Sequence, residues 1–424
     1  MKVLVSSMTF APDHSGISLY ATDFATYASE QGHDVTVVTG FSWYPTWTKR
    51  PEDKRKLFRT DFYKGIKVLR GYLYVPEKVT SITRILQEIS FLIFVFLNFF
   101  RAGKQDVIVL FTTPINLGLI GVFFQKFWKA KLIINVQDLQ LDAAQSLGMI
   151  GKSPLFKVMD KAERYSYRKA DMVTSISTAM IHLIKQKGAL EDKVYLWPNW
   201  INVQDASKQG VEGNFLRKFP QYNGKVIVGY AGNVGVKQSL QSLVDLSEKF
   251  KHRDDVVFLI IGSGGDRTKL KSYAESKAIT NLHFIDFLGQ DDYYSFLCDA
   301  SIVFLSQKRD SGDAYFPSKL LGIMAKKKLI FVSAGKESEI YKVVTDNQIG
   351  MSAEIDDLDQ MKTQLEQYLL NKEQFRHFEQ NAFDFVQQYD RNVVLAALFR
   401  EINRTVLKGI YQTAPAYEQS IKAY

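Results

Sequence analysis

Two lysines in the C-terminal half follow segments that could hold a bound anion. Lys237 comes just after Gly232, Asn233 and Gly235, in a turn that follows the apolar run Lys225–Tyr230. Glycines let the backbone approach a ligand closely, and the free N–H groups at the start of a helix favour a negative group. This pattern suits a diphosphate. A tight turn carrying a solvated lysine is the competing interpretation.

The second lysine, Lys319, follows Asp313, Pro317 and Ser318. Either Pro317 or Ser318 is well suited to begin the helix expected over 320–327. The free N–H groups of that helix, with Ser318 and Lys319, would form another anion site. An ordinary capped helix is the alternative, but two such sites in one molecule favour a shared ligand.

The loop that contains Gly264 is a third glycine-rich turn, Gly262-Ser263-Gly264-Gly265-Asp266. It follows a strongly apolar run, yet it lacks the GxGxxG spacing of dinucleotide-binding proteins. The sequence therefore disfavours a nicotinamide-dependent dehydrogenase.

In the N-terminal half, polar or small residues follow two apolar runs. Gly16 ends the loop after the first run and precedes a helix, which again allows close approach to a ligand. Gln137 and Asp138 directly follow Lys131–Val136. Helix capping is the alternative role for Asp138, and we expect a role in a site.

The sequence predicts neither a catalytic metal nor a disulfide. No HxxH, CxxC or HExxH pattern is present, and Cys298 is the single cysteine. His14 is the best placed of six histidines.

Apolar runs alternate with helical stretches along the whole chain, which predicts α/β architecture with parallel, doubly wound sheets. Two Rossmann-like halves would then face a central cleft. Such sheets bind ligands beyond the carboxyl ends of their strands, so we expect the binding site in that cleft. The expected strands are Val3–Val5, Asp34–Thr39, Asp106–Phe111, Lys131–Val136, Asp171–Ser175, Lys193–Leu196, Lys225–Tyr230, Asp255–Gly262, Leu282–Ile285, Ser301–Leu305 and Leu329–Val332.

The two predicted domains cover residues 1–200 and 201–390. The polar segment 198–223, rich in glycine, asparagine and glutamine, resembles a linker. The C-terminal stretch 391–424 is expected to pack back onto the first domain through its amphipathic helix.

The net charge of +9 is compatible with nucleic acid, anionic lipid or phosphorylated substrates. No nucleic-acid-binding motif is present, so we expect no nucleic acid partner.

Ile89–Phe100 is apolar nearly all round and is flanked by cations, and an aromatic, basic loop runs from Trp43 to Arg50. Both features favour peripheral contact with an anionic membrane, with a buried core helix as the alternative. No signal peptide and no apolar run of spanning length are recognised.

Four segments in order resemble glycosyltransferase family 4, retaining enzymes of the GT-B fold. The resemblance spans about residues 1–405 and is strongest to the subgroup that builds bacterial capsule, colanic-acid-type and O-antigen polysaccharides. The segments are 10–16 (FAPDHSG), 136–139 (VQDL), 230–235 (YAGNVG) and 316–320 (FPSKL).

This resemblance implies a UDP-, GDP- or dTDP-sugar donor on the C-terminal domain and no separate cofactor. The acceptor, a lipid-linked saccharide, would bind the N-terminal domain at the cytoplasmic face of the plasma membrane. Lys237 falls at the family's diphosphate-binding lysine, Asn233 where many members have arginine, and Gln137 near a histidine beside the donor sugar. The family's two glutamates are replaced by Ala314 and Gly322, and Asp313 or Asp310 could substitute for the first.

Two other functions remain open. A sugar-nucleotide 2-epimerase would need more carboxylates and histidines in the cleft than the sequence supplies. The missing glutamates are compatible with a non-catalytic partner subunit of a glycosyltransferase complex. Donor hydrolysis or transfer by the purified chain would distinguish an enzyme from such a non-catalytic subunit.

Overall fold

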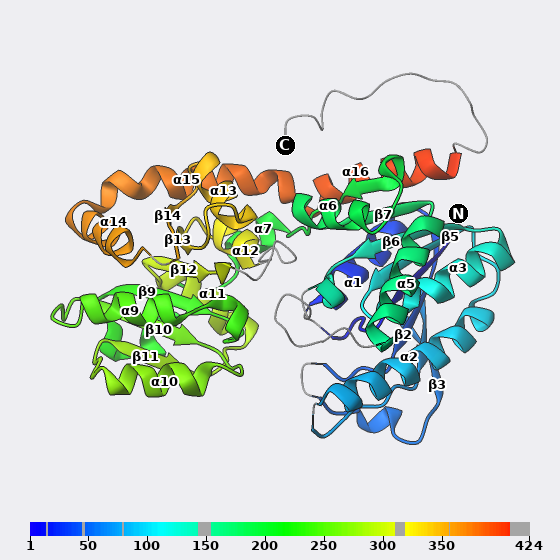
Figure 1. Cartoon of the computed structure of the whole chain (residues 1–424), viewed down its shortest axis with the longest axis horizontal. Helices are drawn as coiled ribbons and strands as arrows, with labels where there is room; N and C mark the ends of the chain where they lie inside the picture. Colours follow the sequence, from blue (N-terminus) through cyan, green and yellow to red (C-terminus); the bar gives the residue numbers. More distant parts are fainter. Residues whose placement is uncertain are drawn as a thin grey trace. The chain divides into compact units, whose positions relative to one another are not determined.

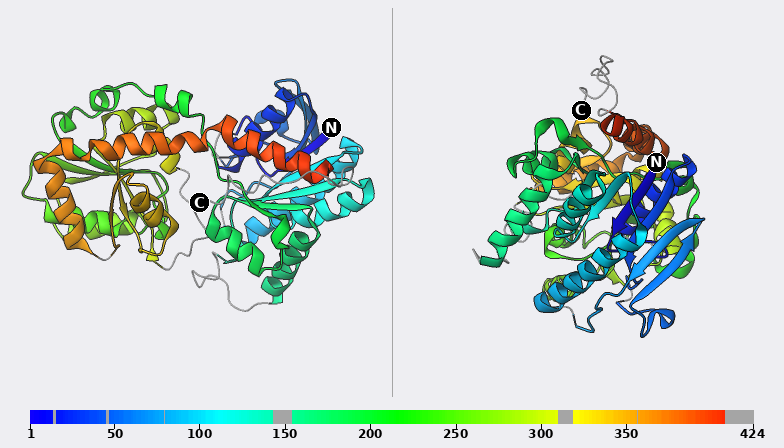
Figure 2. Two further views of the ribbon diagram at one scale, coloured as in Figure 1. Left: turned by 90° about the horizontal axis from the view of Figure 1, so that it is seen from above. Right: turned by 90° about the vertical axis from the view of Figure 1, so that its right-hand side faces the viewer.

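The computed structural model describes residues 1–13, 16–44, 47–78, 80–142, 154–309, 319–355 and 357–407. The chain forms two compact units, each with a sheet between helices (Figures 1 and 2). The first unit contains residues 1–138, 152–197 and the C-terminal helix from Leu395 on, and the second contains Pro198–Val394 together with the described residues 139–142. The two sheets establish the α/β class that the alternating pattern predicts.

The sheet of the first unit has the strand order β3-β4-β2-β1-β5-β6-β7-β8. Only β3 runs antiparallel to its neighbour. The central strands are buried on both faces, as their continuous apolar sequences require. The strands are β1 (Lys2–Ser7), β2 (Asp34–Gly40), β3 (Phe58–Tyr63), β4 (Ile66–Gly71), β5 (Val107–Thr112), β6 (Lys131–Val136), β7 (Met172–Ser175) and β8 (Val194–Leu196).

All strands expected in this half are confirmed, but the β3–β4 hairpin was not predicted. Lys64 and Gly65 form its two-residue turn with φ of 48° and 82°. Consecutive positive φ values are typical of a type I′ hairpin turn, for which glycine at the second position is favourable. The Lys-Gly pair between two runs of strand-favouring residues was therefore the sequence signal that could have predicted this hairpin.

The helices of the first unit pack on both faces of its sheet. α1 lies beside α16, where the rings of Phe24 and Phe399 stack 5.1 Å apart. α2, α3 and α5 follow one another along the sheet (Figure 1). The helices are α1 (Ile17–Glu30), α2 (Ser81–Ala102), α3 (Leu117–Trp128), α5 (Pro154–Lys169), α6 (Thr178–Gln186) and α16 (Arg391–Leu407), with short 3-10 turns η1 (Pro51–Asp53) and η2 (Glu191–Lys193).

The expectation that no apolar segment reaches spanning length is wrong. Ile82–Ala102 of α2 is long and apolar enough to cross a membrane by length and composition, although 28% of its most apolar window is buried in the protein. The sequence interpretation began at Ile89 and omitted Ile82, Ile85 and Leu86, which belong to the same helix.

The second unit has an entirely parallel sheet in the order β11-β10-β9-β12-β13-β14. One apolar core lies on each of its faces. The strands are β9 (Val226–Ala231), β10 (Val256–Ile261), β11 (Leu282–Ile285), β12 (Ile302–Ser306), β13 (Leu329–Ser333) and β14 (Met351–Ala353). The helices are α7 (Val203–Lys208), α8 (Asn214–Lys218), α9 (Gln241–Lys249), α10 (Arg267–Ser276), α11 (Gln290–Asp299), α12 (Lys319–Ala325), α13 (Glu339–Asp346), α14 (Leu358–Leu370) and α15 (Arg376–Val386), with 3-10 turns η3 (Pro220–Tyr222), η4 (Val236–Gln238), η6 (Lys372–Phe375) and η7 (Gln387–Tyr389).

The segment 198–223 is not a linker. It contains α7, α8 and η3, and Val203, Phe215 and Tyr222 are buried in one core of the second unit. Phe215 packs edge-on against Phe296 of α11 with ring centroids 5.4 Å apart. These few apolar side chains dock the segment, although its overall composition is polar.

Candidate functional site

In the second unit, three glycines bring the loops after β9 and β10 into direct backbone contact. Gly232 donates its N–H to the carbonyl of Ile261 at 2.8 Å, and Val234 donates to that of Ser263 at 2.9 Å. A Cβ on Gly262 would lie 2.0 Å from the carbonyl oxygen of Gly232, and one on Gly264 would lie 2.1 Å from that of Val234. The close approach therefore requires glycine at both positions.

The turn that carries Lys237 is fixed from two further directions. The hydroxyl of Tyr230 donates to the carbonyl of Asn233 at 2.6 Å, and the N–H of Gly235 donates to Oε1 of Gln238 at 3.1 Å. The N–H of Lys308 donates to the carbonyl of Lys237 at 2.9 Å. The carboxyl ends of β9, β10 and β12 therefore meet at one backbone cluster.

Lys237 lies shortly before α9 and not in its first turn. It lies in the single turn η4, and α9 starts only at Gln241. Its side chain is partly buried and forms no hydrogen bond or ion pair with any residue that the structure describes. The ammonium of Lys237 is thus available to an anion, but the dipole of α9 does not act at its position.

Lys319 is the first residue of α12, and its amine packs against the start of the same turn. Nζ lies 3.4 Å from the hydroxyl of Tyr230 and 4.9 Å from the centre of the Tyr230 ring. A Cβ on Gly232 would come within 1.3 Å of Nζ, so glycine makes room for the amine. Burial lowers the pKa of Lys319 to about 8, because the charged form loses hydration.

Four of the predicted donor-site residues, Lys319, Gly232, Gly264 and Asn233, thus belong to the carboxyl edge of one sheet, and Gly235 and Lys237 continue the same turn. Asp313, Pro317 and Ser318 lie outside the described residues, as does Asp310. The anion site expected from the N–H groups before Lys319 therefore stays a prediction.

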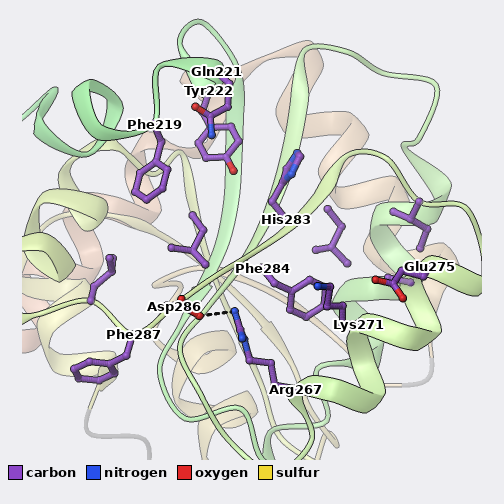
Figure 3. A pocket seen from close by; sticks show the side chains of 15 residues that line it. Phe219, Gln221, Tyr222, Arg267, Lys271, Glu275, His283, Phe284, Asp286 and Phe287 are labelled. Atoms are coloured by element: carbon purple, nitrogen blue, oxygen red, sulfur yellow. Dashed lines mark ion pairs between the residues drawn. The ribbon is translucent and has the colours of Figure 1, made fainter.

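A separate pocket of about 690 Å³ lies along the outer edge of β11 and contains none of the predicted site residues (Figure 3). Arg267 and Asp286 form an ion pair of 2.9 Å at one side of it, and the rings of Tyr222 and His283 meet at the other. Ligands of such sheets bind beyond the carboxyl ends of the strands, so we place the candidate site at the glycine loops.

In the first unit, Gly16 and the pair Gln137–Asp138 belong to the same sheet edge. Gly16 caps α1 with φ of 61°, and a Cβ there would meet nothing within 4 Å. Gln137 donates from Nε2 to Oδ1 of the buried Asn135 at 2.6 Å, which orients its amide. Because β5 alone separates β1 from β6, the two strands that precede these groups lie about 10 Å apart in the sheet. His14 lies outside the described residues.

The sequence reasoning missed a buried polar cluster beside Gly16. Asp13 is 5% exposed, accepts a hydrogen bond at Oδ1 from the Ser42 hydroxyl, and its carboxyl also interacts with the backbone N–H of Trp43. The Arg70 guanidinium pairs with Asp61 at 2.6 Å and also donates to the carbonyl of Ala11. Burial raises the pKa of Asp13 above its ordinary value, although the bond from Ser42 and the charge of Arg70 oppose this shift.

The described residues contain no cluster of metal-binding side chains. No group of three or more His, Cys, Asp or Glu side chains within them could hold a metal ion. The expectation of metal-independent chemistry stays a prediction.

Two family models match the two halves of the chain. Residues 15–200 match the glycosyl transferase 4-like domain, and residues 213–385 match the glycosyl transferases group 1 model. The chain belongs to glycosyltransferase family 4. It is therefore a glycosyltransferase, and its paired parallel-sheet units are the GT-B fold.

Among curated relatives of this family, WcaI of Escherichia coli (strain K12), named as a colanic acid biosynthesis glycosyl transferase, is 29% identical over 339 residues. The alignment covers 77% of the present chain and 81% of WcaI.

Two solved structures show the same fold at low identity. Sucrose-phosphate synthase from Thermosynechococcus elongatus superimposes with a TM-score of 0.72 at 13% identity, covering 96% of this chain and 99% of that one. HepE of Anabaena, solved in complex with UDP, gives a TM-score of 0.69 at 12% identity, covering 95% and 100%.

Proposed function

We propose that this glycosyltransferase moves a sugar from a nucleotide-diphosphate sugar to a lipid-linked saccharide, with retention of the anomeric configuration. The acceptor is a polyprenyl-diphosphate saccharide used in bacterial surface polysaccharide synthesis, in keeping with the similarity to WcaI. The enzyme works in the cytoplasm, at the inner face of the plasma membrane.

One observation carries the donor assignment. The Lys319 amine is buried against Gly232, at the start of the turn that carries Lys237. No carboxylate of the described residues pairs with this amine, and burying an unpaired cation is costly, so the arrangement favours a site whose negative charge arrives with a ligand. A nucleoside diphosphate supplies that charge, and UDP is bound by the structural neighbour HepE.

The chemistry follows from where charge develops. As the bond between the sugar and the diphosphate breaks, negative charge accumulates on the leaving diphosphate, and fixed cations stabilise it without reorganising. Lys319 and Lys237 supply these cations. The acceptor hydroxyl then attacks from the face that the leaving group vacates, and the leaving phosphate takes its proton.

The acceptor binds the carboxyl edge of the first sheet, where Gly16, Gln137 and Asp138 are found. Ser42 and Arg70 hold Asp13 and Ala11 in place at this edge.

Transfer by the purified chain tests the proposal. Labelled UDP-, GDP- and dTDP-sugars are incubated with polyprenyl-diphosphate saccharide in detergent, and the product linkage is assigned by NMR. One donor is expected to be consumed, with the same anomeric configuration in donor and product. If every donor stays intact with acceptor present, the chain is a non-catalytic partner subunit instead. An inverted linkage would refute only the retention of configuration, and the glycosyl transfer itself would stand.

A further inference from the structure

Two neighbouring helices of the first unit expose one continuous apolar surface, which we name the α2–α3 face. The exposed side chains of α2 recur every three or four residues, so they lie on one side of the helix. The rings of Phe96 and Phe123 lie 5.4 Å apart, and those of Phe100 and Phe127 lie 5.9 Å apart, which joins the two helices. The exposed residues of the face are Ile82, Ile85, Leu86, Ile89, Ile93, Leu97, Phe100, Leu119, Phe123 and Phe127.

The opposite side of α2 is committed to the protein core. Phe91, Val95 and Phe99 are at most 1% exposed, and the helix packs on β2 and β4. A Cβ on Gly71 would lie 2.7 Å from Cβ of Phe94, so the helix approaches β4 closely. A helix held along a sheet in this way cannot also cross a bilayer, and large exposed apolar patches mark interaction sites.

The charges around the face indicate its partner. Arg84 and Arg101 of α2, Lys126 of α3, and the adjoining Lys104 and Lys129 are all exposed. Glu88 is the single acidic residue in the sequences of the two helices. An apolar surface bordered by cations complements an anionic lipid interface.

The face starts at the edge of the sheet where the acceptor is expected. β4 ends at Gly71, and α2 begins after its Thr80 cap at the same, carboxyl edge. The Lys49 ammonium lies 3.9 Å from the centre of the Tyr72 ring, which links the loop after β2 to the connection into α2. The first turns of α2 therefore lie at the edge that also carries Gly16 and Gln137.

We propose that the α2–α3 face lies in the interface of an anionic bilayer, with both helices parallel to its plane. It holds the carboxyl edge of the first sheet beside the headgroups, so that an acceptor reaches that edge while its lipid tail stays in the membrane. The lipid contact is independent of the proposed reaction, whereas the presentation of the acceptor rests on it.

The residues proposed here to contact lipid differ in part from those expected from the sequence. Trp43, expected from the sequence to form an aromatic membrane anchor, is only 8% exposed and packs against Trp47. The exposed phenylalanines of α3 take its place, and the sequence analysis did not single them out.

Vesicle flotation of the full chain tests the proposal, with phosphatidylcholine vesicles containing or lacking phosphatidylglycerol. The double variant Ile89→Glu/Ile93→Glu removes apolar area and adds negative charge at the centre of the face. The matched control Val211→Glu/Leu370→Glu adds the same charge at two exposed apolar residues of the second unit. Thermal unfolding verifies that both variants fold.

Wild type and control should float with the anionic vesicles, and the Ile89/Ile93 variant should lose about tenfold or more of the bound fraction. Arg101→Gln/Lys126→Gln should weaken binding to anionic vesicles only. Failure of wild type to float, or equal loss in the control, overturns the proposal. It is also overturned if light scattering shows that the face mediates self-association of wild type without lipid binding.

Transfer to a short-chain, water-soluble acceptor separates this inference from the proposed function. The Ile89→Glu/Ile93→Glu variant should retain that transfer within about twofold while losing transfer to acceptor embedded in vesicles. If wild type floats but transfers no sugar to either acceptor, the reaction is wrong and the lipid contact stands.

Discussion

At the scale of single residues, the proposed donor site depends on a lysine whose pKa is lowered by its surroundings. Lys319 begins α12 and places its amine between Tyr230 and Gly232. Its pKa, lowered to about 8 by burial, lies well within the range of an ordinary assay. In the free enzyme, the Lys319 amine therefore changes charge within the pH range in which activity can be measured.

The first prediction follows from that pKa. A diphosphate binds the charged amine, so donor affinity should be full well below pH 8 and fall as the pH rises through about 8. Lys319→Gln should bind donor weakly and lose this component of the pH dependence. Calorimetric titration of donor nucleotide from pH 6.5 to 9.5 measures both. An unchanged fall of affinity in Lys319→Gln would assign the titration to another group.

The second prediction concerns the buried Asp13 carboxyl. Its folded pKa is raised, so its contribution to stability is full below the unfolded pKa and is lost as pH rises through the folded pKa. Asparagine does not titrate. The melting temperature of Asp13→Asn relative to wild type should therefore increase between pH 4 and pH 7.

Ser42→Ala is the partner variant in this experiment. It removes a hydrogen bond that lowers the pKa of Asp13, so stability should fall more steeply with pH than in wild type. Melting curves that shift in the opposite direction with pH would show that the carboxylate is favoured by the fold.

Sequence reasoning reached Lys237 and Lys319 because each follows a recognisable turn. It did not reach the Asp13 cluster, because burial of one aspartate depends on Ser42 and Arg70, which are distant in sequence. The contact of Lys319 with Gly232 likewise joins α12 to the end of β9, and no local pattern encodes it.

At the scale of elements, the loops after β9 and β10 act as one rigid support. Their backbones hydrogen-bond to each other, and glycine is required where the carbonyls of Gly232 and Val234 approach. The third prediction is that Gly232→Ala displaces the Lys319 amine and strains a backbone with φ of 148°. We expect loss of about 1–3 kcal/mol of stability and a marked loss of donor binding.

Gly265→Ala is the matched control, because its Cβ would meet nothing within 4 Å. Chemical denaturation and donor titration of both variants make the comparison. Donor binding that survives in Gly232→Ala would mean that the position of Lys319 at Gly232 is unimportant.

Elements with continuous apolar sequences were predictable, since strands buried on both faces leave that pattern in a parallel sheet. The antiparallel edge strand β3 was missed because none of its residues is fully buried and three polar residues separate Phe58 from Phe62. The helices α7 and α8 were missed because a few docking side chains decide their structure within a polar segment.

At the scale of the whole molecule, the alternation of strands and helices restarts once, and this restart predicted two parallel-sheet units. The two family models match one unit each, which is compatible with the proposed placement of donor and acceptor on separate units. The surface of the first unit carries a separate property, the α2–α3 face, which depends on two helices at once. The sequence indicated the part of this face that Ile89–Phe100 forms. The exposed residues of α3 were found only in the structure.

The most direct test titrates UDP, GDP and dTDP, with the corresponding monophosphates, into wild type, Lys237→Ala and Lys319→Gln by calorimetry. Lys269→Ala, on the exposed side of α10, controls for the loss of one positive charge. We predict that one diphosphate binds wild type and Lys269→Ala more tightly than its monophosphate. Both site variants should lose about tenfold or more of that preference, as expected for charge-assisted hydrogen bonds. Equal diphosphate preference in all four proteins would contradict the assignment of the donor site.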